Sequence, residues 1–173
     1  MSLRALKEWI LLDYTDRYWN YRENYLRSKT GISRLYYYIK LKRIGAKHNA
    51  DLGVSYHDPS AEIVSKPYMP HGLSGVIISR KAKIGNNCTI LHQVTIGTRM
   101  TAAKSDRKED AIAPIIGNNV FIGAGAKIIG DIHIGDNVLI GANAVVTKDV
   151  PSDYTVVGNP MRMFKTKNEY HKG

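Results

Sequence analysis

The chain has 173 residues, which is enough for one domain, or for one domain with a small appendage, and enough to bury a hydrophobic core. Its net charge is +10, but residues 1–50 hold eleven Lys or Arg against four Asp or Glu, so most of the excess lies in one segment. No nucleic-acid-binding motif accompanies that charge, and the longest apolar run is too short for a membrane span or a signal peptide. We therefore expect a cytoplasmic protein that binds no nucleic acid, and its single cysteine agrees with a reducing compartment.

Residues 1–55 are predicted to form an N-terminal helical cap. Nine aromatic residues lie in the first fifty, with an apolar spacing that predicts helices over about 3–26 and 32–44, separated at Thr30–Ser33. One interpretation is that the aromatic side chains pack against the following domain or a neighbouring subunit. The other is that a basic, aromatic face makes peripheral contact with an anionic membrane or a polysaccharide.

Residues 56–160 contain a repeat of six residues. An apolar residue returns at every sixth position within two runs, and a second apolar residue follows each of them four positions later in the regular units. This period predicts an all-β solenoid in which each unit supplies one short parallel strand and one corner, with both apolar residues pointing inward. Glycine and asparagine in the corners Gly85–Asn87, Gly117–Asn119 and Gly135–Asn137 are expected to supply the positive φ that a corner needs. The leading positions are Ile78, Ile84, Ile90, Ile96, Ile116, Ile122, Ile128, Ile134, Ile140 and Val146.

The repeat is interrupted once, and it ends before the C-terminus. The leads Ile96 and Ile116 are twenty positions apart, so we expect a charged, extruded loop at 98–115. Residues 161–173 are predicted to form a polar tail.

These repeats resemble the hexapeptide repeats of the left-handed parallel β-helix acyltransferases, over about two thirds of the chain. The resemblance implies a left-handed β-helix, a homotrimer and acetyl-CoA as acyl donor. The stretch from His71 to Ile78, followed by 84–87 and 94–98, is similar to the region around the catalytic histidine of serine acetyltransferases and related sugar O-acetyltransferases.

The resemblance places His71 at the position of the general base. Imidazole near neutral pH suits the removal of a hydroxyl proton during attack on a thioester. His92 is a second candidate, which either positions the substrate or is a solvated corner residue, and His57 is a candidate partner for His71. Because Cys88 occupies an inward position, an acyl-enzyme is disfavoured. Backbone amides around Ser74–Val76, or across a subunit interface, are candidates for oxyanion stabilisation.

The C-terminal repeats resemble the coenzyme A end of the same family. Two small residues would let the pantetheine arm lie against backbone amides, and cations would hold the phosphates. The candidate coenzyme-binding residues are Thr98, Ala124, Ala142, Thr147, Lys148, Arg162 and Lys165.

The sequence departs from the serine acetyltransferase pattern at the acceptor side. Pro70 stands where that pattern has an aspartate, Ala113 stands where it has a second histidine, and Tyr56 or Asp58 occupies the place of another carboxylate. Without an anion for an α-ammonium group, we expect an acetyl-CoA-dependent O-acetyltransferase that acts on a saccharide hydroxyl in surface or capsular polysaccharide synthesis. Serine O-acetyltransferase is the alternative, a sugar-nucleotide N-acyltransferase is another, and a non-catalytic trimeric scaffold is the alternative of a different class.

No metal is expected. The γ-class carbonic anhydrases, a zinc-binding branch of this fold, need two histidines five residues apart plus a third. His71, His92 and His133 supply no such pair. The remaining histidines, His48, His133 and His171, are predicted to be surface residues.

Overall fold

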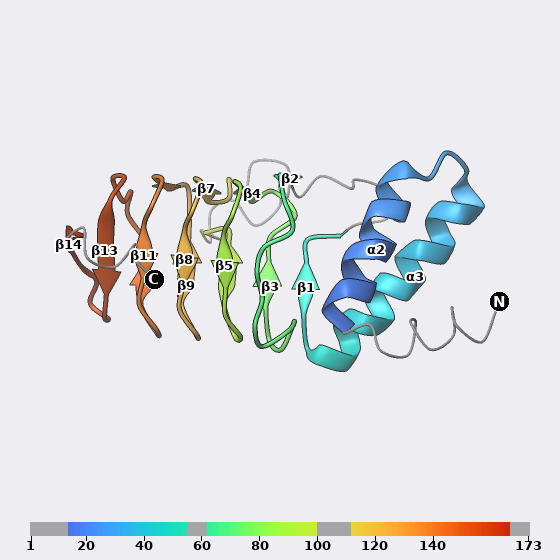
Figure 1. The fold of residues 1–173 in the computed structure, drawn as a ribbon, viewed down its shortest axis with the longest axis horizontal. Helices are drawn as coiled ribbons and strands as arrows, with labels where there is room; N and C mark the ends of the chain where they lie inside the picture. Colours follow the sequence, from blue (N-terminus) through green and yellow to red (C-terminus); the bar gives the residue numbers. More distant parts are fainter. Residues whose placement is uncertain (1–13, 55–61, 100–111, 167–173) are drawn as a thin grey trace.

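The computed structural model describes residues 14–54, 62–99 and 112–166. Two helices stand at one end of a column of short strands, and the chain then winds along the column away from them (Figure 1). The strands form three sheets, in which strands of successive coils pair in parallel, and the last described strand pairs antiparallel. The expected solenoid of hexapeptide repeats with an N-terminal helical segment is confirmed. Within the described residues, no helix is long and apolar enough to cross a membrane.

The helical end consists of α2 (Tyr14–Arg27) and α3 (Gly31–His48). The predicted break between them is the N-cap of α3, where the Thr30 hydroxyl accepts a hydrogen bond from the Ser33 amide at 3.2 Å. At the other end of α3, Asn49 adopts a left-handed conformation with φ of 51°, which ends the helix. The chain then turns directly into the first strand. Buried aromatic and aliphatic side chains hold the two helices on the solenoid, among them Tyr18, Trp19, Tyr25 and Leu41.

The three central coils each contribute one strand to each of three sheets. The first sheet contains β1 (Asp51–Leu52), β3 (Ile77–Ile78), β6 (Thr95–Gly97), β9 (Lys127–Ile129) and β12 (Val145–Val146). The second contains β2 (Glu62–Ile63), β4 (Lys83–Ile84), β7 (Ile115–Ile116) and β10 (His133–Ile134). The third contains β5 (Thr89–Ile90), β8 (Phe121–Ile122), β11 (Leu139–Ile140), β13 (Tyr154–Val157) and β14 (Arg162–Lys165), of which β14 pairs antiparallel with β13 and ends the column.

The inward positions of the repeat form the core. All ten leading aliphatic side chains are buried, and so are the described apolar residues four positions after them. Cys88 occupies one of these inward positions and is 1% exposed. The period of six therefore predicted correctly which side chains point into the solenoid.

The turns from the second to the third sheet differ from expectation in one respect. Positive φ is found at Asn87, Asn119 and Asn137, and not at the glycines that precede them by two positions. Their side chains stack as a ladder, in which the Asn119 amide donates to Asn137 at 3.0 Å. The glycines have a different role, because a Cβ at Gly117 would lie 2.4 Å from an atom of the next coil. They permit close stacking, and the asparagines supply the turn.

The interruption between Ile96 and Ile116 does not disturb the register. Ile96 lies in the first sheet and pairs with Ile128, and Ile116 lies in the second sheet and pairs with Ile84. The two leading residues therefore lie in consecutive sheets of one coil. A regular repeat would separate them by six positions, so the additional residues form an insertion. Most of the predicted loop lies outside the described residues.

Glycine at position 123 is predicted to be required for coil stacking. A Cβ there would lie 2.5 Å from the backbone nitrogen of Ala142, which cannot move without shifting a coil. We expect Gly123→Ala to lower the free energy of unfolding by about 1–3 kcal/mol, measured by chemical denaturation. Gly97→Ala is the matched control, because its nearest contact is the flexible end of Ile129 at 3.2 Å. Equal stability of the two variants would contradict this account of the stacking.

Candidate functional site

The candidate site lies at the turns that lead from the third sheet into the first, which we call the histidine corner (residues 70–75, 91–94, 123–126 and 141–144). Backbone hydrogen bonds stack these turns in register. The Gln93 amide donates to the Ser74 carbonyl at 2.8 Å, and the Gly125 amide donates to the His92 carbonyl at 3.0 Å. Successive coils therefore place equivalent residues one above another along this corner.

His71 and His92 come together at this corner from neighbouring coils. Their ring centroids are 5.0 Å apart and their planes are nearly perpendicular, at 88°. His71 is exposed, as its outward position predicted, whereas His92 is half-buried. The Nδ1 atom of His92 is buried and has no hydrogen-bond partner among the described atoms. The pair thus presents one accessible imidazole, supported by a second that is partly enclosed.

Two of the amides considered for oxyanion stabilisation already have partners. The Gly75 amide donates to the His48 carbonyl at 2.9 Å, and the Val76 amide donates to the Leu73 carbonyl at 3.0 Å. These hydrogen bonds hold the end of α3 and the turn together, so the two amides are structural. These two amides are therefore already engaged, and the Ser74 amide or amides across a subunit interface stay candidates.

The histidine corner continues past the histidines to the predicted pantetheine residues. Ala124 lies one coil beyond His92 and Ala142 one coil beyond Ala124, because the Asn143 amide donates to the Ala124 carbonyl at 2.8 Å. Ala124 is half-buried and Ala142 is exposed. The small side chains leave a strip along the corner that leads away from His71.

The other predicted coenzyme residues lie elsewhere on this chain. Thr98 follows β6 and Thr147 follows β12, so both lie at the opposite edge of the first sheet, with Lys148 beside Thr147. Arg162 and Lys165 lie at the two ends of β14, on the terminal coil, and both are exposed. One subunit therefore does not bring all seven residues together.

The remaining histidines are placed differently. His133 is exposed, as predicted. His48 is half-buried, and its ring packs against Tyr14 with centroids 5.0 Å apart, so its description as a surface residue is wrong. The helix that carries it is pressed against the solenoid, a contact that the repeat pattern does not reveal. His57 and His171 lie outside the described residues.

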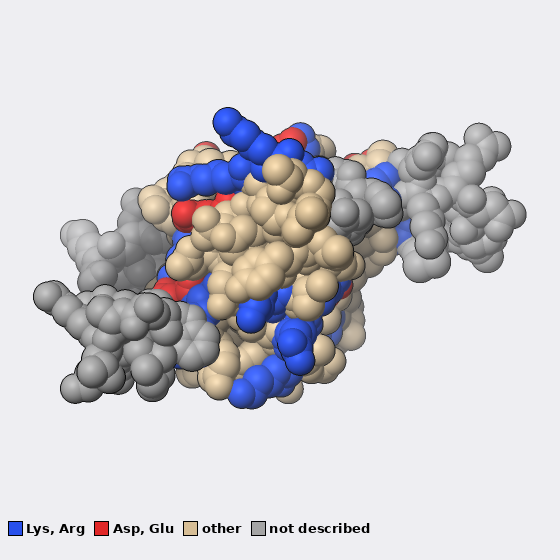
Figure 2. Space-filling view, turned by 90° about the vertical axis from the view of Figure 1, so that its right-hand side faces the viewer, with Lys and Arg blue, Asp and Glu red and all other residues tan. Residues whose placement is uncertain are grey.

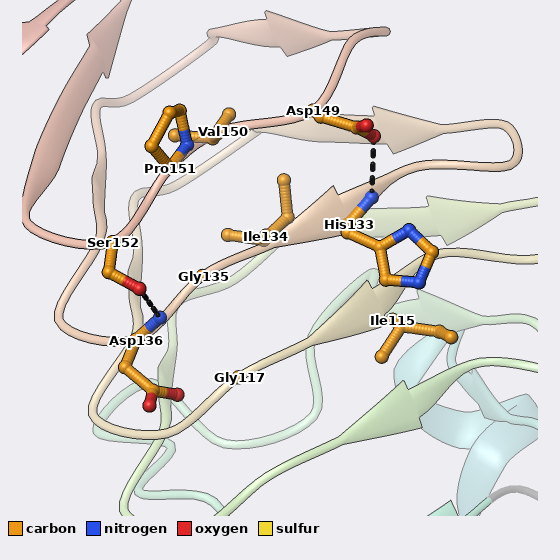
Figure 3. Close-up of a pocket in the computed structure, with 10 residues that line it drawn as sticks. All are labelled: Ile115, Gly117, His133, Ile134, Gly135, Asp136, Asp149, Val150, Pro151 and Ser152. Atoms are coloured by element: carbon orange, nitrogen blue, oxygen red, sulfur yellow. Dashed lines mark hydrogen bonds between the residues drawn. The ribbon is translucent and has the colours of Figure 1, made fainter.

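A hollow of about 450 Å³ on the second sheet contains none of the predicted site residues (Figure 3). Its polar atoms are used for coil stacking, since Asp149 accepts from the His133 amide at 2.8 Å and Ser152 accepts from the Asp136 amide at 3.0 Å. The carboxylate of Asp136 in turn accepts from the Asn118 amide. These satisfied groups indicate a structural role for this surface.

The helical end carries exposed apolar and basic side chains. Figure 2 views this end and shows Lys and Arg around a surface formed by other residues. Ile32, Leu35, Tyr36 and Ile39 on α3 are at least 45% exposed. Peripheral contact with an anionic membrane stays a prediction.

Among the described residues, no group of three or more His, Cys, Asp or Glu is arranged to hold a metal ion.

Comparison with known proteins identifies the family. The model of the bacterial transferase hexapeptide, with six repeats, matches residues 113–148. Serine acetyltransferase of Synechococcus elongatus is 45% identical over 111 residues, which are 64% of this chain and 42% of that protein. The chain belongs to the hexapeptide-repeat transferases.

Solved structures of this family agree with the fold. The structure of Neisseria gonorrhoeae serine acetyltransferase in complex with serine has a TM-score of 0.66 and 31% identity, over 87% of this chain and 55% of that one. Serine acetyltransferase from Brucella abortus has a TM-score of 0.69 and 30% identity, over 89% of this chain and 58% of that one. The chain spans about half the length of these relatives.

The expectation of a saccharide acceptor is contradicted by these comparisons. The relative and the two structures compared above are serine acetyltransferases, which favours the alternative given with it. The saccharide prediction depended on missing carboxylates at particular sequence positions. A charge that an acceptor needs can be supplied by another element of the fold, so those absences did not decide the acceptor.

The inward position of Cys88 generates a prediction about its reactivity. Its sulfur donates to the Gly117 carbonyl at 3.3 Å, and burial raises the pKa of its thiol. A raised pKa leaves less reactive thiolate at neutral pH, and the fraction increases only under more alkaline conditions than for a free cysteine. We expect an aryl disulfide to label the folded protein slowly at pH 7 and the denatured protein rapidly. Rapid, stoichiometric labelling of the folded protein would reopen the acyl-enzyme alternative.

Proposed function

We propose that this protein transfers an acetyl group from acetyl-CoA to the hydroxyl of serine. The observation that carries the proposal is the pair of imidazoles at the histidine corner, in a chain that is 45% identical to a serine acetyltransferase over 111 residues. Histidine is the side chain best suited to take a hydroxyl proton near neutral pH.

His71 acts as the general base in this proposal. It accepts the hydroxyl proton of serine as the oxygen attacks the thioester carbonyl, so that a C–O bond forms and the C–S bond then breaks. The departing thiolate takes a proton, which the imidazolium can return. His92 supports the ring of His71 through the perpendicular contact and helps to fix its orientation.

The strip along the histidine corner supports the coenzyme assignment. Ala124 and Ala142 leave room for an extended pantetheine arm, and exposed Arg162 lies on the terminal coil, where a phosphate group would be solvated. Thr98, Thr147 and Lys148 lie at the opposite edge of the first sheet. A neighbouring subunit would supply its own copy of each sheet edge. The separation of these residues on one chain therefore supports a homotrimer in which acetyl-CoA lies between subunits.

Replacing the base is expected to abolish most of the turnover. We expect His71→Ala to lower kcat for thiol release from acetyl-CoA with serine by about 10²–10⁴-fold, the usual contribution of a general base. His133→Ala removes an exposed histidine from the second sheet and should retain parental turnover. Parental turnover in His71→Ala would end the catalytic assignment. Turnover with other hydroxyl compounds and none with serine would end the acceptor assignment.

Filling the strip is expected to weaken coenzyme binding. We expect Ala124→Leu to raise the KM for acetyl-CoA roughly tenfold, because the larger side chain would occupy space needed by the pantetheine arm. The KM for serine should change little. Ala46→Leu, at an exposed position of α3, is the matched control. An unchanged KM for acetyl-CoA in Ala124→Leu would remove Ala124 from the coenzyme site.

A further inference from the structure

We propose that one face of α3 docks on an anionic membrane surface. Its aliphatic and tyrosine side chains enter the boundary between headgroups and acyl chains, and its basic side chains contact the lipid phosphates. The docking uses none of the residues of the histidine corner, so it is separate from acetyl transfer. We call this surface the outer face of α3, and its residues are Ile32, Leu35, Tyr36, Ile39, Lys40 and Arg43.

Helix α3 is apolar on two sides, and the packing of the protein accounts for only one of them. Leu41 and Gly45 are buried, and Tyr37, Tyr38 and Ile44 pack against the core. The exposed apolar residues of the outer face return at intervals of three or four positions, which places them together along the helix. Apolar side chains grouped in this way on a surface mark an interaction site.

The run of three tyrosines shows the same division. Tyr37 and Tyr38 are half-buried, whereas Tyr36 is 52% exposed. The Nζ atom of Lys40 lies 5.3 Å from the centroid of the Tyr36 ring. A tyrosine with a lysine and aliphatic residues beside it suits the interface of a bilayer, where the ring meets acyl chains and the hydroxyl and ammonium groups meet headgroups.

The charge of α3 is complementary to an anionic surface. The helix contains five Lys or Arg and no Asp or Glu. Lys42 is paired with Asp51 at 2.8 Å, but Lys40 and Arg43 form no ion pair within the described part of the chain. Lys and Arg side chains are gathered around an uncharged surface at this end of the molecule (Figure 2). Basic side chains so placed are attracted by anionic lipids within about a Debye length.

A membrane fits this face better than a second copy of the chain does. In a symmetric dimer formed through the outer face, each α3 would meet an identical helix. Lys40 and Arg43 would then approach like charges, and α3 supplies no carboxylate to neutralise them. An anionic bilayer offers negative charge and an apolar interior together, which is the combination that the outer face requires.

Co-sedimentation of the full chain with lipid vesicles tests the proposal. The parent protein should bind vesicles of equal parts phosphatidylcholine and phosphatidylglycerol, and it should bind vesicles of phosphatidylcholine alone about tenfold more weakly or less. Ile39→Ser removes an exposed aliphatic side chain, and the double variant Lys40→Gln, Arg43→Gln removes two charges. Each should weaken binding to the anionic vesicles about tenfold. Added salt should weaken the binding of the parent protein.

The controls make the same chemical changes on another part of the molecule. Val64→Ser removes an exposed aliphatic side chain beside β2, and the double variant Lys81→Gln, Lys83→Gln removes two charges at β4. Both should bind anionic vesicles as the parent protein does. Serine and isoleucine have similar helix propensities, so Ile39→Ser should keep α3 folded. Similar unfolding midpoints for all variants would separate docking from folding.

Three outcomes would overturn the proposal. The first is that the parent protein binds neither kind of vesicle, or binds both equally. The second is that Ile39→Ser binds anionic vesicles as tightly as the parent protein, because the attraction would then be that of any basic protein for anions. The third is that Ile39→Ser lowers the molar mass measured by light scattering and leaves vesicle binding unchanged, because the outer face would then be an interface between copies.

Discussion

Successive coils touch backbone to backbone at a set of glycines, and this contact fixes the geometry of the whole solenoid. A Cβ added at Gly85, Gly123 or Gly135 would lie 2.5–2.6 Å from a backbone atom of the next coil, and one added at Gly117 would lie 2.9 Å from such an atom. Real side-chain atoms do not approach so closely, so the coils can stack at strand spacing only where these positions carry no side chain. The ladder of hydrogen-bonded asparagine side chains beside them then keeps the corners in register.

Register is what assembles the histidine corner. His71 and His92 are distant in sequence but occupy equivalent turns of neighbouring coils, and the same stacking carries the strip on to Ala124 and Ala142. The insertion after Ile96 leaves this column intact, because β6 still pairs with β9 and β4 with β7. A solenoid can accept extra residues at one corner without moving another, since each coil is held by its neighbours above and below.

The repeating part of the structure could be predicted from the sequence, because each leading aliphatic residue of the six-residue unit marks a buried position. Ile128 and Cys88 are inward for the same reason, a period that matches the coil. Outward placement of His71 follows from the same register. The roles of single corner residues were harder to predict, because glycine and asparagine both suit a turn. Only the structure shows that Gly117 allows the next coil to approach closely and that Asn119 adopts a positive φ.

The acceptor side was the least accessible part, for a physical reason. A repeat pattern says which residues of the solenoid face outward, but it gives no information on how α2 and α3 pack against the first coil. His48 was therefore mistaken for a surface residue, and the proximity of Thr15 to Gly72 had no signal in the sequence. Recognition of a charged acceptor depends on where charges lie in space, so the carboxylate absent before His71 need not be absent from the site.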